Sequence, residues 1–361
     1  MLKIYSRVHD SEDGHLAVIK SFGDVPAEDR RAAIDHGREV EEMIALEPQQ
    51  GAGSAWCDID DAMTWLDLHN PTRDEELFVE GALGVGIPTR EDMNEIETSS
   101  RLYTEDGAVF MTAQVAYFGG QPHLQSGPVT FALLRERLVT VRYIDPQSFR
   151  IFSDKISRSP ALCDSAAMTL TNLLDVLIDR TADLVEKVSA GVDDISTQIF
   201  ATKANRGLDK LLRQMGRHQN DIAKLRDSLL SFQRLFSYGL LLSDDQVSGD
   251  ATELEVFRAR LRSLHEDAQS LTDHAGYVTG NITYLQEAAM GLINIEQNSI
   301  IKIVSVASAA FLPPTLIASI YGMNFEHMPE LHVAVAYPLA IGAMVLSAVL
   351  PMIWFKYKGW L

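Results

Sequence analysis

The chain has 361 residues, with 31 Lys and Arg against 50 Asp and Glu, so its formal net charge at pH 7 is −19. This length predicts two or more structural units. The acidic excess argues against a nucleic-acid-binding protein and suits either solvation or the attraction of cations. The cysteines, Cys57 and Cys163, form no CxxC motif or Cys/His cluster, so we expect neither a structural zinc site nor a disulfide framework.

The first 160 residues predict an α+β domain in which helices cover a mixed sheet. The first stretch, "LKIYSRV", favours a strand, and the following charged stretch "AEDRRAAIDHGREVEEMIAL" favours a helix. Other strand-like stretches are rich in β-branched and aromatic residues: "LAVIK", "AVFMTAQVAYF", "PVTFALL" and "RLVTVRYI". The N-terminus lacks an apolar core long enough for a signal peptide, so we expect this domain to stay in the cytoplasm.

Residues 161–242 predict a cytoplasmic helical hairpin. Apolar residues recur at helical spacing from about residue 160 to 202 and again from about residue 205 to 238. The polar break "LSDDQVSGD" follows the second helix and separates the hairpin from the next element.

Residues 251–321 predict one long helix that continues into a membrane span. Its apolar residues alternate spacings of three and four, which is a coiled-coil-like heptad stripe. No proline interrupts this pattern before Pro313 and Pro314, which we expect to kink the helix inside the membrane. At 1.5 Å per residue the helix would be roughly 100 Å long. The stripe consists of Leu254, Phe257, Leu261, Leu264, Ala268, Leu271, Ala275, Val278, Ile282, Leu285, Ala289 and Leu292.

Two uncharged apolar runs, about residues 303–321 and 333–355, predict transmembrane helices. A buried hairpin in a soluble core is the alternative. Lys302 precedes the first run, and Lys356 and Lys358 lie in the tail that follows the second, residues 356–361, whereas the linking loop has no Lys or Arg. The positive-inside rule therefore predicts a multi-pass protein of the inner (plasma) membrane with both chain ends in the cytoplasm.

The first span carries a small and mildly polar stripe. Counting back from Gly322 in steps of three and four gives Ser319, Thr315, Leu312, Ser308, Ser305, Ile301 and Asn298. Helix packing and pore lining are both compatible with such a stripe. Because neither span carries a charge, we expect no proton relay or voltage sensor. A neutral path lined by oxygen atoms suits a cation that keeps its water, as Mg²⁺ does.

The loop of residues 322–332 begins with Gly322-Met323-Asn324 and would lie outside the cytoplasm. Asn324 side chains and backbone carbonyls would present oxygen dipoles to the water shell of an arriving ion, and Gly322 would let the backbone leave the helix. The carboxylates of Glu326 and Glu330 would draw divalent cations to the entrance. His327 and His332 as zinc ligands are a less favoured reading, since no third ligand is evident.

The chain resembles the CorA family of divalent-cation channels, which includes the ZntB zinc branch. "YGMNF" directly after a proline-containing span, the "MPEL" loop, and a second span with a basic tail carry the resemblance. It extends through "FLPPTLIASIYGMNFEHMPEL" and, more loosely, through residues 67–107 and the long helix. The resemblance implies a funnel-shaped homopentamer that conducts Mg²⁺, with Co²⁺ and Ni²⁺ as further candidate ions, driven inward by the membrane potential.

The same resemblance implies roles for individual residues. Gly322-Met323-Asn324 would be the selectivity filter, Asn298 and Thr315 would line the pore, and Leu312 would belong to a hydrophobic constriction. Lys302, Lys356 and Lys358 would form a basic collar at the inner mouth, for which membrane topology alone is an alternative explanation. We expect no enzyme activity, because no nucleophile–base arrangement stands out, and no cofactor besides transported and regulatory Mg²⁺.

The family further implies gating by intracellular Mg²⁺ that is bound between cytoplasmic domains by acidic side chains. The sequence pattern does not place those acids, and an ordinary solvated helix face is the alternative for each of them. Candidates on the long helix are Glu253, Glu255, Glu266, Asp267 and Asp273, and candidates on an earlier helix are Asp175, Asp179 and Asp183.

Two other functions stay open at this point. The chain could be a zinc transporter of the ZntB branch, although the acidic "MPEL" loop looks more like the magnesium branch. It could also be a membrane-anchored coiled-coil scaffold with no transport activity.

Overall fold

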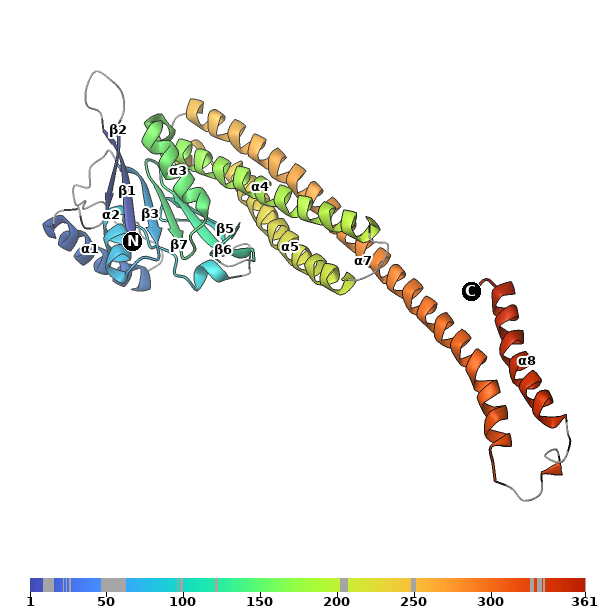
Figure 1. The fold of residues 1–361 in the computed structure, drawn as a ribbon. Helices are drawn as coiled ribbons and strands as arrows, with labels where there is room; N and C mark the ends of the chain where they lie inside the picture. Colours follow the sequence, from blue (N-terminus) through green and yellow to red (C-terminus); the bar gives the residue numbers. More distant parts are fainter. Residues whose placement is uncertain are drawn as a thin grey trace. The chain divides into compact units, whose positions relative to one another are not determined.

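The computed structural model describes residues 1–8, 16–21, 23, 25, 27–46, 63–95, 97, 100–120, 123–201, 207–247, 251–324, 328–329, 333 and 335–360. Figure 1 shows the chain as a ribbon. Two compact units are distinguished by their internal contacts. The first unit comprises Met1–Ile195 with Arg213–Thr283, and the second unit comprises Ser196–Leu212 with Tyr284–Leu361.

A seven-stranded mixed sheet organises the first unit. The strand order is β2-β1-β3-β7-β6-β5-β4, in which β3 and β7 are parallel and every other neighbouring pair is antiparallel. The strands are β1 (Leu2–Val8), β2 (Leu16–Ser21), β3 (Met63–His69), β4 (Leu102–Glu105), β5 (Ala108–Tyr117), β6 (Gln125–Leu133) and β7 (Leu138–Arg142).

Helices account for most of the remaining described chain. They are α1 (Ala27–Leu46), α2 (Arg73–Leu83), α3 (Gln147–Arg158), α4 (Ala166–Ala201), α5 (Leu208–Gly239), α6 (Asp244–Val247), α7 (Ala251–Tyr321) and α8 (Ala336–Tyr357). Short 3₁₀ turns lie at Asp92–Asn94 and Pro160–Cys163. The helix expected from about residue 160 therefore begins later, at Ala166, where the Ser165 hydroxyl accepts the Met168 N–H and caps it.

Helices α1 and α2 cover one face of the sheet. Alternate strand residues such as Leu66 and Leu68 point to this face and pack with Phe78 and Val79 of α2 in one buried cluster. The two helices approach closely at glycines: a Cβ atom on Gly81 would lie 1.8 Å from the Ala33 carbonyl oxygen. Only a residue without a side chain fits at this crossing.

The opposite face of the sheet packs against α3, and α5 lies along the edge of β5 beyond its pairing with β4. Trp65 of β3 lies fully buried beside Phe149 and Phe152 of α3, with ring centroids 6.4 and 5.3 Å away. Ser228 and Ser231 of α5 accept hydrogen bonds from the backbone N–H groups of β5. The unit is therefore a mixed sheet with helices on both faces, which confirms the predicted sheet covered by helices.

A buried ion pair joins the two parallel strands. The Arg142 guanidinium of β7 donates to both carboxylate oxygens of Asp67 in β3, at 3.0 and 2.9 Å. The Thr140 hydroxyl donates to the same carboxylate and accepts the Trp65 indole N–H. Each charge is thus surrounded by partners, which is the condition under which ion pairs persist in an interior.

Helices α4, α5 and α7 supply the long helical part of the chain. The heptad stripe of α7 is buried from Leu254 to Ala289, apart from a partly exposed Leu271. The Gln233 side chain of α5 donates to the Ala268 carbonyl and the Thr272 hydroxyl of α7, at 3.1 and 2.8 Å. The stripe predicted from the sequence is therefore confirmed as the packing face of α7.

The second unit holds the chain's most apolar helices. The last part of α7 and α8 run in opposite directions (Figure 1) and are joined by residues 322–335. Helix α7 remains helical through Pro313 and Pro314, and ends at Tyr321. Both helices are long and apolar enough to cross a membrane, with a mean hydropathy of 1.8 for α7 and 2.0 for α8 in their most apolar windows.

The close approach of α1 and α2 yields a stability prediction. Gly81→Ala should destabilise the full-length protein by about 1–3 kcal/mol, because a backbone carbonyl occupies the place of the new methyl group. Gly216→Ala is the matched control: it lies on α5 with nothing within 4 Å of a Cβ atom and should be neutral or stabilise by about 0.5–1 kcal/mol. Thermal unfolding followed by circular dichroism measures both, and equal transition temperatures for the two variants would contradict the close crossing.

Candidate functional site

The Gly322-Met323-Asn324 motif directly follows the last turn of α7. The Gly322 N–H donates to the Ala318 carbonyl at 2.9 Å, and the Met323 N–H donates to the Ile320 carbonyl at 3.3 Å. Helix α7 ends at Tyr321, directly before Gly322, and Gly322 is not among the residues with positive φ. The helix instead ends by tightening its last hydrogen bond to a 3₁₀ type, which needs no left-handed residue.

A different property of Gly322 emerges from this geometry. A Cβ atom on Gly322 would lie 3.1 Å from the Ala318 carbonyl oxygen, which is a tight contact. With glycine at this position, no side chain covers the backbone at the end of α7. Met323 and Asn324 are exposed at this end. The acids Glu326 and Glu330, together with His327 and His332, lie outside the described residues.

The predicted pore stripe lies on an exposed face of α7. Leu312 is 67% exposed and Ile301 is 60% exposed. Five members of the stripe are also exposed or, for Ser305, partly exposed: Asn298, Ser305, Ser308, Thr315 and Ser319. The Thr315 hydroxyl donates to the Phe311 carbonyl at 2.7 Å, which leaves the oxygen lone pairs available to an outside donor.

A second stripe of the same span is less exposed. Val306 is buried, and residues at helical spacing from it, Ala310, Pro313 and Ile317, are partly buried. Helix α8 has its own covered stripe of Ala336, Ala340, Met344, Pro351 and Phe355. At about 100° per residue, the covered stripe and the predicted pore stripe of α7 lie on nearly opposite sides of the helix.

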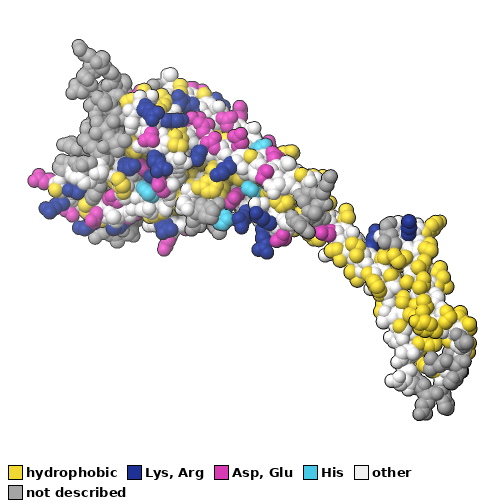
Figure 2. Space-filling model, viewed as in Figure 1, with side chains coloured by type: hydrophobic (Ala, Val, Ile, Leu, Met, Phe, Trp, Pro, Cys, Tyr) yellow, Lys and Arg dark blue, Asp and Glu magenta, His cyan; other side chains and the backbone are white. Residues whose placement is uncertain are grey.

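Most of the surface of both apolar helices is uncovered in a single chain. Only 6% of each most apolar window is buried, and Figure 2 shows hydrophobic side chains spread over this segment. A soluble protein rarely exposes a continuous apolar surface of this extent. Lipid or further protein must therefore cover these helices.

Three of the candidate regulatory acids come near one another in the first unit. Asp175 and Asp179 of α4 and Asp267 of α7 interact electrostatically. Partial desolvation and these two like charges raise the pKa of Asp175, while Lys155 and Arg260 act in the opposite direction. The residues come from two helices about 90 positions apart in sequence, so spacing within one helix did not reveal their convergence.

The other candidate acids are separate from this group. Glu253 accepts a hydrogen bond from the Ser165 hydroxyl, Glu255 pairs with Arg258 at 3.6 Å, and Asp183 pairs with Arg180 at 2.9 Å. Glu266 and Asp273 are exposed. Over the part of the chain that the structure describes, no group of three or more His, Cys, Asp or Glu side chains could hold a metal ion.

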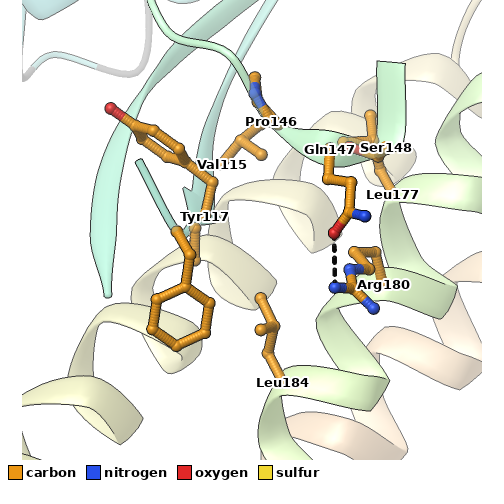
Figure 3. Close-up of a pocket in the computed structure, with 10 residues that line it drawn as sticks. Val115, Tyr117, Pro146, Gln147, Ser148, Leu177, Arg180 and Leu184 are labelled. Atoms are coloured by element: carbon orange, nitrogen blue, oxygen red, sulfur yellow. Dashed lines mark hydrogen bonds between the residues drawn. The ribbon is translucent and has the colours of Figure 1, made fainter. Parts of the chain in front are cut away.

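The Arg180 side chain also closes a small cavity between the end of β5, the start of α3 and α4. Figure 3 shows Arg180 reaching Gln147, to which its Nη2 donates at 2.7 Å. The cavity has a volume of ≈30 Å³, which is enough for a water molecule but not for an organic substrate. A wider opening of ≈330 Å³ lies between the first turns of α4 and α7 and is lined by Met168, Phe257 and Arg260 among others.

The three lysines of the predicted collar are exposed in the second unit. Lys358 is held between two indoles, with its Nζ 4.6 Å from the Trp354 ring and 5.9 Å from the Trp360 ring. The spacing of Trp354 and Lys358, four residues apart on one helix face, was the signal that could have predicted their contact.

Together, the apolar helix pair, the stalk helix that leads into it and the α/β unit define a membrane protein with two spans near its C-terminus. The profile of the family described as "CorA-like Mg2+ transporter protein" matches residues 60–357. The chain belongs to this family.

Similar proteins agree over most of the chain. The magnesium transport protein CorA of Escherichia coli (strain K12) is 34% identical over 298 residues, covering 82% of this chain and 92% of that protein. The corresponding protein of Haemophilus influenzae is also 34% identical, over 299 residues. Among solved structures, the complete CorA magnesium transporter of Methanocaldococcus jannaschii has a TM-score of 0.67 at 15% identity and covers 82% of this chain and 91% of its own.

The full-length CmaX protein has a comparable fold. Its TM-score is 0.64 at 14% identity, and the match covers 99% of this chain and 98% of that one. At such identities the two structural matches establish the fold. The curated relatives and the family profile establish the family.

The acid group on α4 and α7 yields a pH-dependent stability prediction. Because the folded pKa of Asp175 is raised, the folded state binds this proton more tightly than the unfolded state, and stability falls as pH rises from the ordinary value of 3.8 through the folded value. Asp175→Asn should therefore raise the unfolding temperature of the metal-free protein at neutral pH, with a difference that vanishes below that window. Thermal scans in chelator across pH measure this.

Asp227→Asn, an exposed acid on α5, is the matched control and should have little effect at any pH. An unfolding temperature that drops in the Asp175 variant at neutral pH would contradict the repulsion among the three carboxylates.

Proposed function

We propose that the chain is a subunit of a Mg²⁺ channel in which several copies surround one axis and each contributes the pore stripe of α7. The observation that carries this proposal is the opposition of the two stripes on that helix. If the covered stripe of α7 faces α8, then the stripe from Asn298 to Ser319 points away from α8. A ring of copies can then place α7 inside and α8 outside.

Two helices cannot enclose a hydrated path, so the proposal requires an oligomer. The apolar surface left uncovered in one chain supports this requirement. We propose five copies because the resemblance to the CorA family implies a homopentamer, with the cytoplasmic units forming the wide end of a funnel. Magnesium as the ion is supported by the names of the curated relatives, which are magnesium transport proteins.

The filter would consist of the bare helix end at Gly322 and the exposed amide of Asn324. Mg²⁺ dehydrates reluctantly, so a filter that contacts its water shell with oxygen dipoles avoids the cost of stripping that shell. Glu326 and Glu330 would concentrate cations outside the filter. Leu312 would form the constriction, because an apolar ring resists a hydrated ion when it is narrow.

The lysines at the ends of the two spans support an orientation. Lys302 and Lys356 would lie on the cytoplasmic side of the inner membrane, which puts both chain ends in the cytoplasm and the Gly322-Met323-Asn324 motif outside. A divalent ion that moves inward gains about 4.6 kcal/mol per 100 mV, twice the value for a single charge. Influx then needs no other energy source, and the proposal includes neither an enzymatic step nor a cofactor.

Regulation by intracellular Mg²⁺ is part of the proposal. The described residues of one chain lack a three-ligand site, so a regulatory ion would need ligands from a second copy. Asp175, Asp179 and Asp267 are the best-supported contributors, because their mutual repulsion would be relieved by a divalent cation. The other candidate acids, Glu253, Glu255 and Asp183, already have partners in one chain, and Glu266 and Asp273 remain available.

We propose the domain boundaries that the sequence predicts: residues 1–160 as the α/β domain, 161–242 as the hairpin, 251–321 as stalk and first span, and 333–355 as second span.

Co²⁺ and Ni²⁺ are further candidate ions. Zinc transport and a scaffold without transport are the competing functions. Uptake of Mg²⁺, Co²⁺, Ni²⁺ and Zn²⁺ into liposomes distinguishes them, since zinc flux without magnesium flux, or no flux at all, overturns the proposal.

The filter assignment predicts a specific loss of transport. Asn324→Ala should lower Mg²⁺ influx into liposomes at least about tenfold, which corresponds to about 1.4 kcal/mol in the barrier. The reason is that the amide oxygens that receive the hydrated ion are removed. Asn220→Ala, an exposed asparagine on α5, should leave influx unchanged. Equal influx through both variants rejects the filter assignment.

The constriction predicts the opposite effect. Leu312→Ser should raise Mg²⁺ flux when internal Mg²⁺ is high, because a hydroxyl ring lets water enter the narrow part of the pore. Leu339→Ser on α8, where the leucine is 66% exposed, is the control for a polar group elsewhere in a span. If the Leu339 variant leaks as much as the Leu312 variant, the polar substitution acts through general damage to the membrane helices.

A further inference from the structure

The C-terminal end of α8 is capped by its own backbone hydrogen bonds. Gly359 adopts a left-handed conformation with φ +71°, its N–H donates to the Lys356 carbonyl at 3.1 Å, and the Trp360 N–H donates to the Phe355 carbonyl at 3.0 Å. This pair of bonds around a left-handed glycine is the Schellman motif. The motif turns the chain back, so that Trp360 returns to the helix instead of leaving it.

The returned tryptophan completes an aromatic cluster. The Trp360 and Phe355 rings stack with centroids 5.2 Å apart, and Trp354 contacts Phe355 at 5.1 Å. Phe355 is 8% exposed, which makes it one of two buried side chains in the described residues after 290. The ammonium of Lys358 lies over both indoles, at cation–π distances from their faces. A positive charge is therefore held at a defined height among rings that favour the headgroup region.

Basic side chains predominate at this end of the helix pair, where Glu296 is the last acid of α7 before Lys302. From residue 297 to the last residue, the sequence contains three lysines, Lys302, Lys356 and Lys358, and its only acids are Glu326 and Glu330 in the connecting loop. Lys302 and Lys356 are each about 30 Å of helix from that loop, at 1.5 Å per residue. Because α7 and α8 run in opposite directions, all three lysines belong to the end opposite the acids.

We propose that this C-terminal cap, residues 354–360, binds the phosphate of an anionic phospholipid. The indoles would anchor α8 at headgroup depth, while Lys358 between them and the exposed Lys356 would contact the phosphate. Charge complementarity selects this occupant: the surface is basic and aromatic, and the inner leaflet is the anionic surface nearest to a membrane helix end. The proposal rests on the proposed orientation, in which α8 crosses the bilayer and ends at the inner leaflet, and does not depend on which ion is conducted.

Native mass spectrometry of the full-length protein, extracted from vesicles of mixed phosphatidylglycerol and phosphatidylcholine, tests the cap. Wild-type protein should retain phosphatidylglycerol in excess over phosphatidylcholine. Lys358→Gln should lower that excess about fivefold, as expected for one lysine near an anionic surface, and Lys358→Arg should retain it. Inorganic phosphate should not displace the lipid, because a free phosphate lacks the acyl chains that α8 also contacts.

Two variants distinguish a built site from loose charge. Trp354→Leu keeps every charge but removes one of the rings that hold Lys358, so it should also lose phosphatidylglycerol selectivity. Lys187→Gln removes a lysine of α4 whose ammonium lies 4.8 Å from the centre of the Phe118 ring. This variant should leave phosphatidylglycerol selectivity unchanged. The proposal is overturned if Trp354→Leu binds like wild type, if Lys187→Gln loses as much as Lys358→Gln, or if phosphate displaces the lipid. Magnesium flux measured in parallel is a separate readout, so its failure alone would bear on the proposed channel and not on the cap.

Discussion

The structure depends on one helix that passes from an aqueous environment into an apolar one without a break. In a bilayer each backbone N–H and C=O must find a partner within the protein, and an uninterrupted helix meets that demand for nearly all of its residues. Helix α7 does so over its 71 residues. What changes along it is the surroundings of its side chains. The heptad stripe is buried as far as Ala289, and beyond that point most side chains are exposed in a single chain, apart from the covered stripe that contains Val306. The sequence must therefore encode two different packing faces on one rod, and a straight helix permits this because a seven-residue repeat drifts around its axis.

Charge is distributed to match these surroundings. The helices that bury the heptad stripe carry acids on their outer faces, and two of these acids, Asp179 and Asp267, lie near enough to Asp175 to contribute to its raised pKa. The apolar helices carry no charge until their ends, where lysines appear on one side and acids on the other. In the sheet interior, the buried charges of Asp67 and Arg142 are joined by two hydrogen bonds. In both regions a charge is tolerated only where water, an opposite charge or a polar surface can solvate it.

Sequence reasoning predicted the elements whose pattern is local. The long helix was predicted because its apolar periodicity is regular and no proline lies between residues 251 and 312. The apolar spans were predicted from hydropathy. Strand β3 was missed because it is buried on both faces, so no alternation marks it, and because it contains Asp67, which reads as a surface residue. Its partner Arg142 lies 75 positions away, beyond any local pattern. The convergence of acids from α4 and α7 was hidden for the same reason.

The end of α7 shows a subtler limit. The glycine of the Gly322-Met323-Asn324 motif was expected to let the backbone leave the helix, for which a left-handed conformation is one common geometry. The hydrogen bonds show that the helix simply tightens there. Conversely, Gly359, a left-handed glycine that does close a helix, was not singled out, although it lies just after α8 and precedes a tryptophan. Glycine identity alone does not distinguish these two uses, because in both cases the sequence shows only a glycine near the end of an apolar helix.

The adjacent prolines in α7 have a mechanical consequence. Neither Pro313 nor Pro314 has an N–H group, so the carbonyls of Ala309 and Ala310, one turn earlier, lack their usual intrahelical donors. Two neighbouring backbone hydrogen bonds are thus missing on the side of the helix that bears the covered stripe. The side that bears Leu312 and Thr315 keeps its backbone hydrogen bonds. A rod weakened on one flank flexes about the intact flank. Tilting of the last part of α7, residues 313–321, would therefore pivot close to Leu312 and sever no backbone hydrogen bond in doing so.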